Sequence, residues 1–284
     1  MKKILWIASY PKSGNTLMRS LISSLIYSDD GHFSFPILEN IKQLDIDYFY
    51  KFVQQLNNDD YKNLNKLDIV SKYWEIAQKN SYDVEKRFIF KTHAANLMIN
   101  NSKYTNENRS LGLIYIVRDP RDVAVSYSYF NNAGLVNTIE RLKNNRAVLI
   151  NSNNKIIVPL SSWDTHVKSW NMLNVPKYII RYEDLILDKK KYLLEIIDFL
   201  ENTLKIKLKI SEEKLSNILN STSFTKLQKT EKETGYYAFA DKKNSDWQFF
   251  RKGTSKQWLS ELSQLQIQDI NNTFGDTMKK YKYL

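Results

Sequence analysis

The chain contains no cysteine, which excludes disulfide bonds, thiolate metal sites and thiol nucleophiles. Its three histidines, His32, His93 and His166, are too far apart in the sequence to suggest a metal site, so we expect no bound metal. No apolar stretch approaches the ~20 residues that a membrane-spanning helix needs. With only 7 glycines and 5 prolines we find no flexible linker, and we find no internal repeat, so we predict one domain over residues 1–284.

The first ten residues, MKKILWIASY, have the beginning of a signal peptide, because two lysines precede an apolar run. That run ends at Pro11 and Lys12 after about seven residues, and no small-residue cleavage site follows it. We therefore interpret it as a strand, and we expect a soluble, cytoplasmic protein.

Positive charge is in excess, since 42 Lys and Arg stand against 31 Asp and Glu and the formal net charge is +11. An excess of this size is typical of proteins that bind an anionic ligand, an anionic polymer or an acidic surface. The alternative is a general abundance of lysine on the solvated surface. Both interpretations stay open, while the apolar content of 42% is sufficient for a core.

Short apolar runs alternate with helical patterns along the chain. The runs that predict buried strands are residues 4–8, 87–91, 113–117 and 178–181. A helix is expected from near Thr16, because leucines recur there at four-residue steps. Further helical patterns cover residues 122–130, 163–173, 190–200 and 259–273. This alternation predicts an α/β fold with a parallel sheet covered on both faces.

A polar segment follows each predicted strand. These segments are SYPKSGNT (9–16), KTH (91–93), RDPRDVAVS (118–126) and YEDL (182–185). Ligands of parallel sheets bind beyond the carboxyl ends of the strands. We therefore expect the four segments to gather at one edge of the sheet and to form the functional site there.

The first of these segments has the position of a phosphate-binding loop, between a strand and a helix N-terminus. Backbone N–H groups from Ser13 to Thr16 can face an anion there, and Gly14 allows a close approach of the backbone. Compared with the triphosphate pattern G-x-x-x-x-G-K-[ST], only the second glycine and the final hydroxyl fit. Asn15 stands where that pattern needs lysine, and Lys12 precedes the glycine by two residues. An ordinary Pro-Lys-Ser-Gly turn is the alternative.

Arg118 ends the third predicted strand and can form a fork onto a phosphate. It can equally pair with Asp122 or Glu183 as a structural ion pair, and both interpretations stay open. Pro120 suits the first position of the helix that follows, with Asp119 or Asp122 as its cap.

His93 follows a strand by two residues, where an imidazole can act as a general base near neutral pH. We interpret His32 and His166 as structural residues. Lys91 ends the same strand, with a solvated lysine as the alternative role. Near the C-terminus, RKG (251–253) can clamp a second phosphate or can belong to the solvated surface.

Together these segments resemble the cytosolic type of sulfotransferases that use PAPS (3′-phosphoadenosine 5′-phosphosulfate). The resemblance runs from about residue 4 to residue 258 and consists of YPKSGNT, KTH, IVRDPRDVAVSYSYF, YEDL and RKG, in that order. It implies a three-layer α/β/α sandwich around a central parallel sheet, similar to the P-loop nucleotide kinases. It also implies an enzyme that moves a sulfuryl group from PAPS, as co-substrate, to a hydroxyl or amine without a metal.

The resemblance assigns roles to matching positions. It implies that Lys12 stabilises the leaving phosphate, that His93 is the general base, and that Lys91 and Ser126 complete the catalytic set. The implied cofactor-binding residues are Lys12, Ser13, Gly14, Asn15 and Thr16 at the 5′-phosphosulfate, Arg118, Ser126, Arg251, Lys252 and Gly253 at the 3′-phosphate, and Tyr182, Thr222 and Phe224 around the adenosine.

The chain departs from the family pattern at three places. Leu17 stands where the family often has a tryptophan stacked on adenine. Lys256 and Gln257 precede Trp258 where the family usually has Gly-Asp. The Lys-Thr-Val dimer motif of many animal members is not evident, so the oligomeric state stays open.

Two other functions compete with this interpretation. A nucleotide kinase of related fold needs a lysine after Gly14, which this chain lacks. A basic nucleic-acid-binding module needs its basic residues along an open face rather than around one pocket.

We expect a small-molecule or saccharide acceptor and neither a nucleic acid nor a membrane as partner. Two insertions, 31–80 and 131–162, are candidates for the acceptor site, the second as an Asn-rich lid. Aromatic residues that can line the acceptor site or belong to the core are Phe33, Phe35, Tyr48, Phe49, Tyr50, Phe52, Tyr236, Tyr237 and Phe239.

Overall fold

The computed structural model describes residues 3–44, 50, 56–85, 88–150, 156–205, 207–235 and 248–284. The chain divides into two compact units. We call residues 1–15, 42–182 and 257–284 the sheet unit, and residues 16–41 and 183–256 the helical unit. A single domain over the whole chain stays a prediction.

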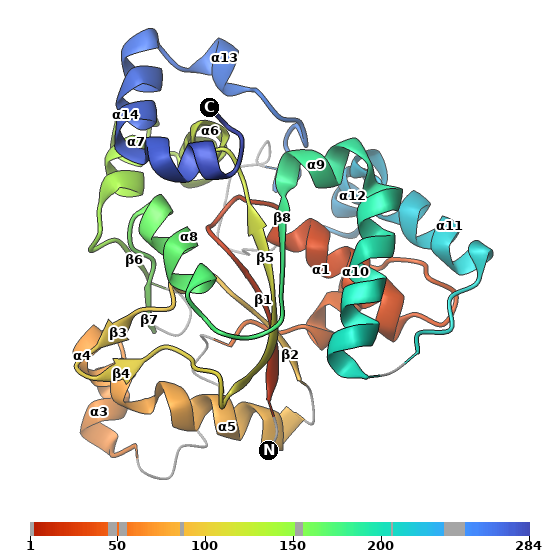
Figure 1. Cartoon of the computed structure of the whole chain (residues 1–284), viewed down its shortest axis with the longest axis horizontal. Helices are drawn as coiled ribbons and strands as arrows, with labels where there is room; N and C mark the ends of the chain where they lie inside the picture. The colour runs from red at the N-terminus through yellow and green to blue at the C-terminus, as the bar shows by residue number, and fades with distance from the viewer. Residues whose placement is uncertain are drawn as a thin grey trace. The chain divides into compact units, whose positions relative to one another are not determined.

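The sheet unit is built on four parallel strands, which Figure 1 shows side by side. They are β1 (Ile4–Ser9), β2 (Ile89–Thr92), β5 (Ser110–Val117) and β8 (Lys177–Arg181). Their order is β2-β1-β5-β8, and every neighbouring pair is parallel. The four predicted strands correspond to these four, and the α/β class with a central parallel sheet is confirmed. The strand predicted over 87–91 ends one residue later than expected, because β2 continues to Thr92. It therefore ends directly before His93.

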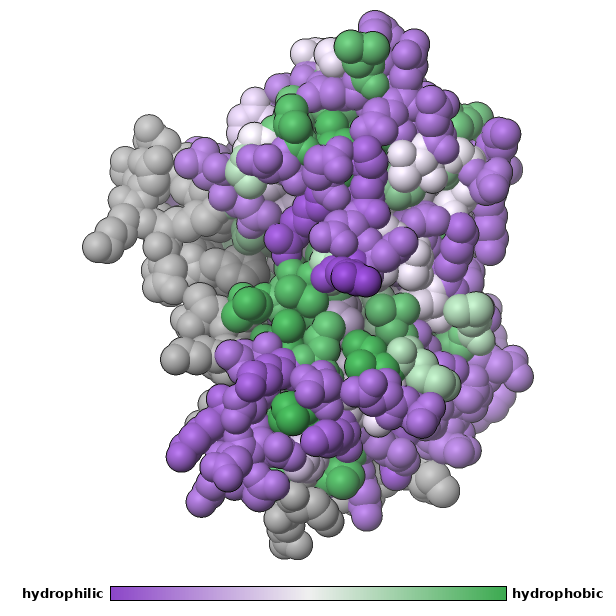
Figure 2. Space-filling model, turned by 90° about the vertical axis from the view of Figure 1, so that its left-hand side faces the viewer, coloured by the Kyte–Doolittle hydropathy of each residue, from purple (hydrophilic) through white to green (hydrophobic). Residues whose placement is uncertain are grey.

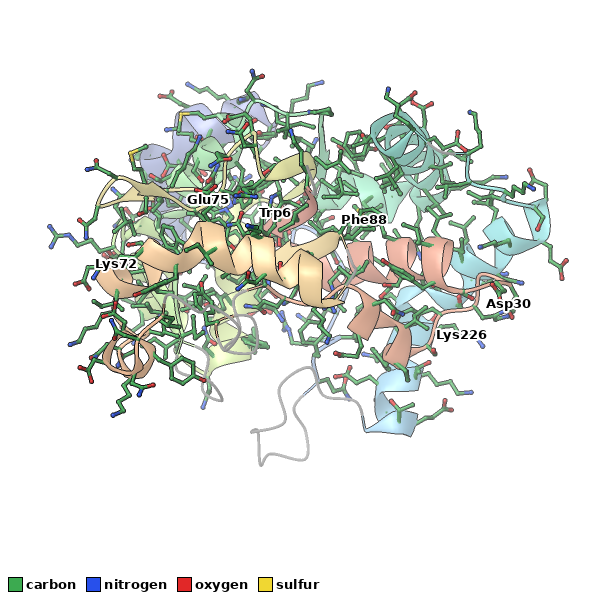
Figure 3. All side chains as sticks on the ribbon, turned by 90° about the horizontal axis from the view of Figure 1, so that it is seen from below. Trp6, Asp30, Lys72, Glu75, Phe88 and Lys226 are labelled. Atoms are coloured by element: carbon green, nitrogen blue, oxygen red, sulfur yellow. The ribbon has the colours of Figure 1, made fainter. Side chains whose placement is uncertain are left out.

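The strands form where the sequence is apolar without interruption. Every residue of β1 is buried, and so are all residues of β5 except Leu111. Trp6 of β1 is fully buried, and it lies among the ribbons in Figure 3. Such continuous apolar runs are typical of parallel strands, whose two faces are both covered. In register, Ala8 of β1 pairs with Thr92 of β2, so the carboxyl ends of these two strands lie next to each other.

Helices and two short hairpins complete the sheet unit. Helices of this unit whose bounds the described residues give are α3 (Asn58–Lys62), α4 (Leu67–Val70), η2 (Ser71–Tyr73), α5 (Trp74–Glu85), α6 (Pro120–Asn131), α7 (Leu135–Lys143), α8 (Trp163–Asn171), α13 (Trp258–Glu261) and α14 (Gln264–Lys280). The antiparallel hairpins are β3 (Met98–Ile99) with β4 (Ser102–Lys103), and β6 (Val148–Ile150) with β7 (Ile157–Pro159). Helix α5 was not predicted. Near its start Lys72 and Glu75 are exposed (Figure 3). The Trp74 side chain between them is buried.

The predicted helix 259–273 was wrong in its boundaries. Two helices occupy this stretch, because the side chain of Ser263 accepts a hydrogen bond from the Gln266 N–H and caps a new helix there. The Gln266 side chain in turn accepts from the Ser263 N–H, which completes a capping box. Helix α14 then continues past residue 273, since Phe274 and Met278 keep its inner face buried.

The helical unit contains α1 (Asn15–Tyr27), η1 (Phe35–Asn40), α9 (Tyr182–Leu187), α10 (Lys189–Leu204), α11 (Glu212–Ser221) and α12 (Phe224–Thr234), where α1 and α9 each begin at the last residue of a sheet-unit segment. Its apolar cluster is Phe35, Leu38, Leu227 and Phe250. Glu231 is buried beside this cluster and its carboxylate accepts the backbone N–H groups of both Phe249 and Phe250. This pairing anchors the chain just before the segment 251–253.

Most of the face shown in Figure 2 is hydrophilic, and hydrophobic residues gather in one part of it. Exposed large apolar side chains in the sheet unit include Met98, Val136, Met172 and Leu265. In the described part of the chain, no helix has the length and apolar character needed to cross a membrane.

The turn between β5 and α6 binds the C-terminal segment of the sheet unit through Arg121. Asp119 caps α6 by accepting the Arg121 N–H at 2.9 Å, and Pro120 is the first helical residue, as predicted. The guanidinium of Arg121 binds the Asp119 carboxylate at 2.7 Å and donates to the Tyr283 carbonyl at 2.8 Å. It also lies 3.9 Å from the ring centre of Trp258. Because Arg121 and Asp119 are both 5% exposed, this is a buried ion pair.

We expect Asp119→Ala to lower the free energy of unfolding by about 3–5 kcal/mol, because a buried guanidinium is left without its carboxylate. Asp119→Asn retains an acceptor for the helix cap and should cost less. Urea denaturation followed by circular dichroism measures both variants. An Asp119→Ala protein as stable as the wild type would contradict the structural role of the pair.

Candidate active site

The loop after β1 has a backbone that only particular residues adopt easily. Lys12 has φ +65° and Gly14 has φ +99°, both in the left-handed region. A Cβ at position 14 would lie 2.5 Å from Cδ2 of Tyr182, so a side chain is excluded on steric grounds as well. Glycine at this position therefore lets the loop fold directly onto the Tyr182 ring.

Lys12 lies at the centre of a group of side chains from three predicted segments. Its ammonium is 4.1 Å from the ring centre of Phe130, at the C-terminal end of α6. Its carbonyl accepts a hydrogen bond from Nη1 of Arg118 at 2.8 Å. The Arg118 guanidinium lies 4.3 Å from the ring centre of Tyr182. The structure thus brings together Lys12, Gly14, Arg118 and Tyr182, as the sequence predicted for the strand ends.

Ser13 and Asn15 have different roles in the loop. The Ser13 hydroxyl is buried and, within the described residues, has no hydrogen-bond partner, so it can serve an anion. Asn15 donates from Nδ2 to the Ser9 hydroxyl at 3.2 Å and to the Ile7 carbonyl at 3.4 Å. Its side chain therefore ties the loop back to β1. Helix α1 begins at Asn15, which leaves backbone N–H groups of its first turn available to a ligand.

His93 is connected to the end of β1. Its Nδ1 lies 2.8 Å from the Ser9 carbonyl oxygen. Because a carbonyl only accepts, Nδ1 must carry the proton, and the lone pair of the neutral imidazole is then on Nε2. The geometry therefore assigns the tautomer in which Nε2 can accept a proton.

His166 is fully buried and lies directly behind His93. Its Nε2 is 3.1 Å from the His93 carbonyl oxygen, and its Nδ1 is 2.7 Å from the Tyr115 hydroxyl. By the same argument Nε2 donates to the carbonyl and Nδ1 accepts from the tyrosine. Burial lowers the pKa of His166 to about 3, so the ring is neutral at neutral pH. The prediction of a structural histidine is confirmed here, whereas its contact with the candidate base was not foreseen.

Lys91 and Ser126 lie on elements that lead to this region. Lys91 is half-buried in β2, and its backbone N–H donates to the Lys42 carbonyl at 2.9 Å. Ser126 is half-buried in the second turn of α6. Their catalytic roles stay predictions.

In the helical unit, Thr222 is fully buried and its hydroxyl donates to the Ile218 carbonyl at 2.6 Å. Its own carbonyl accepts from Nζ of Lys189 at 2.9 Å, and burial lowers the pKa of that lysine. Thr16 is half-buried in the first turn of α1. These contacts keep Thr222 fixed, and its role at the adenosine stays a prediction.

The segment 251–253 packs on Phe224 within the helical unit. Gly253 has φ +65°, and a Cβ there would lie 2.1 Å from Cδ2 of Phe224. Arg251 is half-buried and Lys252 is exposed. The structure therefore brings the predicted late loop and one predicted adenosine residue into direct contact.

The predicted acceptor aromatics fall into two groups. Tyr50 and Phe35 are 2% exposed and belong to the cores of the sheet and helical units. Phe33 packs against the second of these cores. The others, Tyr48, Phe49, Phe52, Tyr236, Tyr237 and Phe239, lie outside the described residues. The second insertion, 131–162, contains α7 and the β6–β7 hairpin, and its role as a lid stays a prediction.

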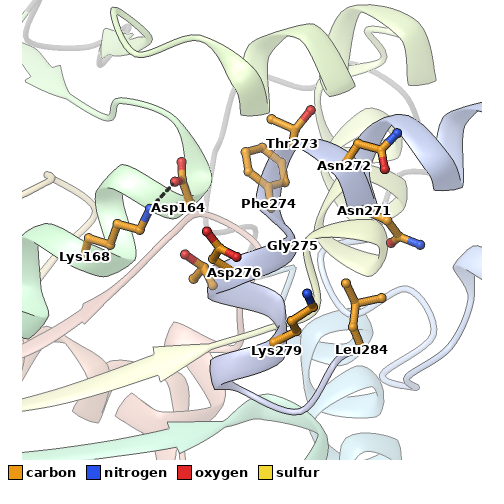
Figure 4. A pocket seen from close by; sticks show the side chains of 11 residues that line it. Asp164, Lys168, Asn271, Asn272, Thr273, Phe274, Gly275, Asp276, Lys279 and Leu284 are labelled. Carbon is orange, nitrogen blue, oxygen red and sulfur yellow. Dashed lines mark hydrogen bonds and ion pairs between the residues drawn. The ribbon is translucent and has the colours of Figure 1, made fainter.

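A pocket of about 430 Å³ lies in the sheet unit between residues of α8 and α14 (Figure 4). Asp164 and Lys168 on its α8 side point toward each other and form an ion pair at 2.9 Å. No residue of the predicted site lines it. It therefore contributes nothing to the site built around Lys12 and His93.

The sequence analysis did not identify Phe130, whose ring contacts the Lys12 ammonium. A signal was available, because Ser126 and Phe130 are four residues apart and so share one face of α6. The contact of His166 with His93 had no such signal, since 73 residues separate the two.

Comparisons relate the whole chain to known proteins. A family model described as "Sulfotransferase domain" matches residues 2–282. Sulfotransferase 1E1 of Homo sapiens is 25% identical over 286 residues, which covers 96% of this chain and 83% of that protein. Amine sulfotransferase of Oryctolagus cuniculus is 24% identical over 284 residues, covering 97% of this chain and 81% of that protein.

Two solved structures show the same fold. The crystal structure of mouse sulfotransferase SULT7A1 complexed with PAP superimposes with a TM-score of 0.58 at 18% identity, over 100% of this chain and 89% of that one. The structure of retinol dehydratase in complex with androsterone and inactive cofactor PAP has a TM-score of 0.58 at 20% identity, over 97% and 80%.

The buried neutral His166 predicts a pH dependence of stability. The pKa of His166 in the folded protein is about 3 against an ordinary 6.5, so between these values the unfolded chain binds a proton that the folded chain does not. The contribution of His166 to the free energy of unfolding is complete above pH 6.5. As the pH falls from 6.5 toward 3, this contribution decreases by up to about 1.4 kcal/mol per pH unit.

Guanidinium denaturation of the wild type and His166→Gln between pH 7 and pH 4 measures this effect. The difference in the free energy of unfolding between the two proteins should shrink or reverse toward acid. A constant difference over that range would show that His166 takes up a proton in the folded state.

Proposed function

This chain belongs to the sulfotransferase family and is a sulfotransferase, and we propose that it transfers the sulfuryl group of PAPS to a hydroxyl or amine of a small acceptor. When bound, PAPS supplies a sulfuryl group on a phosphate that can leave as PAP, adenosine 3′,5′-bisphosphate. The residues around Lys12 and His93 bind, orient and move protons for that reaction.

The loop from Lys12 to Thr16 is suited to hold the 5′-phosphosulfate. The buried Ser13 hydroxyl needs an acceptor, and the first turn of α1 presents N–H groups with the positive end of the helix dipole. Asn15 follows Gly14, where a triphosphate-binding loop has a lysine that binds the β- and γ-phosphates. The Asn15 side chain is hydrogen-bonded to β1 instead. These features favour a 5′-phosphosulfate over a nucleoside triphosphate.

Lys12 neutralises the negative charge that develops on the bridging oxygen as the sulfuryl group departs. An interaction that strengthens only in the transition state accelerates the reaction rather than tightening substrate binding. The ring of Phe130, 4.1 Å from the ammonium, holds the lysine side chain at the C-terminal end of α6.

His93 takes the proton of the acceptor hydroxyl or amine through Nε2. The observation that carries this proposal is the hydrogen bond between Nδ1 of His93 and the Ser9 carbonyl at 2.8 Å. It fixes the tautomer that a general base needs, and it attaches the base to the strand that leads into the Lys12 loop.

Arg118 is suited to the 3′-phosphate, remote from the reacting centre, where it supplies binding and orientation. It is 5% exposed and its Nη1 is bound to the Lys12 carbonyl. A buried arginine beside a loop favours a small anionic ligand over a nucleic acid laid on an open basic face. We assign Ser126, Tyr182, Thr222, Phe224 and 251–253 to the same nucleotide, and Lys91 to the sulfuryl group.

The acceptor is a small molecule or a saccharide that offers a hydroxyl or an amine. Among the curated relatives, the amine sulfotransferase is named for the second of these groups. The two insertions 31–80 and 131–162 are the segments that we assign to acceptor recognition.

A thermal shift experiment separates the donor site from that of a kinase. PAP without Mg²⁺ should raise the melting temperature, because it carries both phosphates that Ser13 and Arg118 are proposed to bind. Mg-ATP should raise it less at equal concentration. A larger stabilisation by Mg-ATP would overturn the PAPS assignment in favour of a nucleotide kinase.

Transfer of labelled sulfate from PAPS to a panel of phenols, alcohols, amines and saccharides tests the chemistry. With an acceptor found in this way, His93→Ala should lower kcat by about 10²–10⁴-fold. Lys12→Ala should lower it by roughly 10²–10³-fold, as expected for loss of a group that stabilises developing charge.

Two lysines outside the proposed acceptor segments serve as controls. Lys207→Ala removes an exposed lysine that is paired with Glu201, and Lys229→Ala removes an exposed lysine of α12 that is paired with Glu233. Both controls should retain wild-type kcat. Wild-type turnover in His93→Ala or Lys12→Ala, with PAP binding intact, would refute the assigned roles.

A further inference from the structure

One face of helix α8 holds the segment that follows β2. His166, Ser169 and Trp170 have the spacing i, i+3, i+4, so their side chains share one side of the helix. Nε2 of His166 reaches the His93 carbonyl at 3.1 Å, and Nε1 of Trp170 donates to the Ala94 carbonyl at 2.8 Å. The Ser169 hydroxyl accepts the Asn96 N–H at 3.0 Å.

Two further backbone groups of this segment are also bound. The Ala94 N–H donates to the Thr92 hydroxyl at 2.9 Å, and the Ala95 N–H donates to the Pro159 carbonyl at 2.7 Å. The chain that carries the proposed base is therefore fixed from His93 to Asn96. Of the three α8 contacts, only the one from His166 acts on the peptide of His93 itself.

His166 is itself held by one residue of a strand and one residue of the loop after β1. Tyr115 of β5 donates its hydroxyl to Nδ1, and the Tyr10 ring packs edge-on against the imidazole with 5.4 Å between ring centres. Tyr10 is two residues before Lys12, at the start of the loop. The imidazole of His166 thus contacts the chain that leads to both proposed catalytic residues.

We propose that His166 is a positioning residue for the reaction: its Nε2–H holds the His93 carbonyl so that the His93 ring donates to Ser9 and keeps Nε2 for the acceptor proton. This inference rests on the proposed role of His93 as the base. A neutral ring is required, because a doubly protonated His166 could not accept from Tyr115. Its deep burial provides that state.

Two substitutions separate the hydrogen bond from the volume of the ring. His166→Phe keeps a ring but removes the donor, and it should lower kcat roughly 10–100-fold with the KM for PAPS unchanged, since a small misplacement of a catalytic group is costly. His166→Gln offers an amide N–H near the place of Nε2 and should recover most of kcat. An equal loss in both variants would overturn the proposal.

Tyr115→Phe gives a second route that leaves the histidine in place. Without the tyrosine hydroxyl, Nδ1 of His166 loses its donor and the ring is no longer fixed in one orientation. We expect kcat to fall in the same direction but less than in His166→Phe. The control is Trp163→Leu, which weakens the same helix where it packs on Phe274 and should lower the melting temperature without lowering kcat.

A double-mutant cycle shows whether His166 acts through His93. In a His93→Ala background, His166→Phe should cause no further loss of kcat. The same fold-loss in both backgrounds would mean that the effect is on the fold in general, and it would overturn the positioning role.

Nitrogen NMR of labelled histidine tests the geometry without turnover. In the wild type the His93 ring should show the Nδ1–H tautomer, and in His166→Phe it should become a mixture of both. An unchanged Nδ1–H tautomer in His166→Phe would overturn the inference. A wild type that has this tautomer but transfers no sulfuryl group from PAPS would instead overturn the proposed function.

Discussion

The hydrogen bond from the His93 ring to the Ser9 carbonyl is the constraint on which the candidate site depends. It is possible because β1 and β2 are parallel neighbours whose ends are in register at Ala8 and Thr92. The hydrogen-bond ladder between β1 and β2 ends at that pair. The next carbonyl of β1 on this side is that of Ser9, and it accepts from the His93 imidazole instead of from a backbone N–H. A side chain thereby extends the backbone ladder by one step, so the sheet sets the orientation of the base. The loop that carries Lys12 leaves from the same strand end.

The four strands were predictable because parallel strands bury both faces and so appear as unbroken apolar runs, as at β1 and β5. The same topology made the positions of Lys12, His93 and Arg118 predictable, since polar residues after such strands gather at one edge. The cap at Asp119 was predictable from local chemistry alone. Assignment of the chain to the family followed from these short segments and their order.

What the sequence did not reveal depends on contacts between distant positions or on competition between local signals. The apolar spacing over 259–273 favoured one helix, but the capping box at Ser263 interrupts it. The side-chain contacts of Asn15 with Ile7 and Ser9 of β1 were not foreseen, and its role in cofactor binding stays a prediction. His166 looked like an ordinary buried histidine, and its partner His93 is known only once α8 is packed against the segment after β2.

Lys12 has a left-handed backbone conformation, which is unfavourable for a lysine. An L-residue there costs roughly 1–2 kcal/mol relative to glycine, and asparagine also tolerates the region better than lysine does. A glycine or an asparagine would therefore give a more stable turn. Under the role proposed for Lys12, the chain accepts a less stable turn in order to keep an ammonium at that point. Engineering that optimises the thermostability of this loop would accordingly tend to remove the charge on which turnover is proposed to depend.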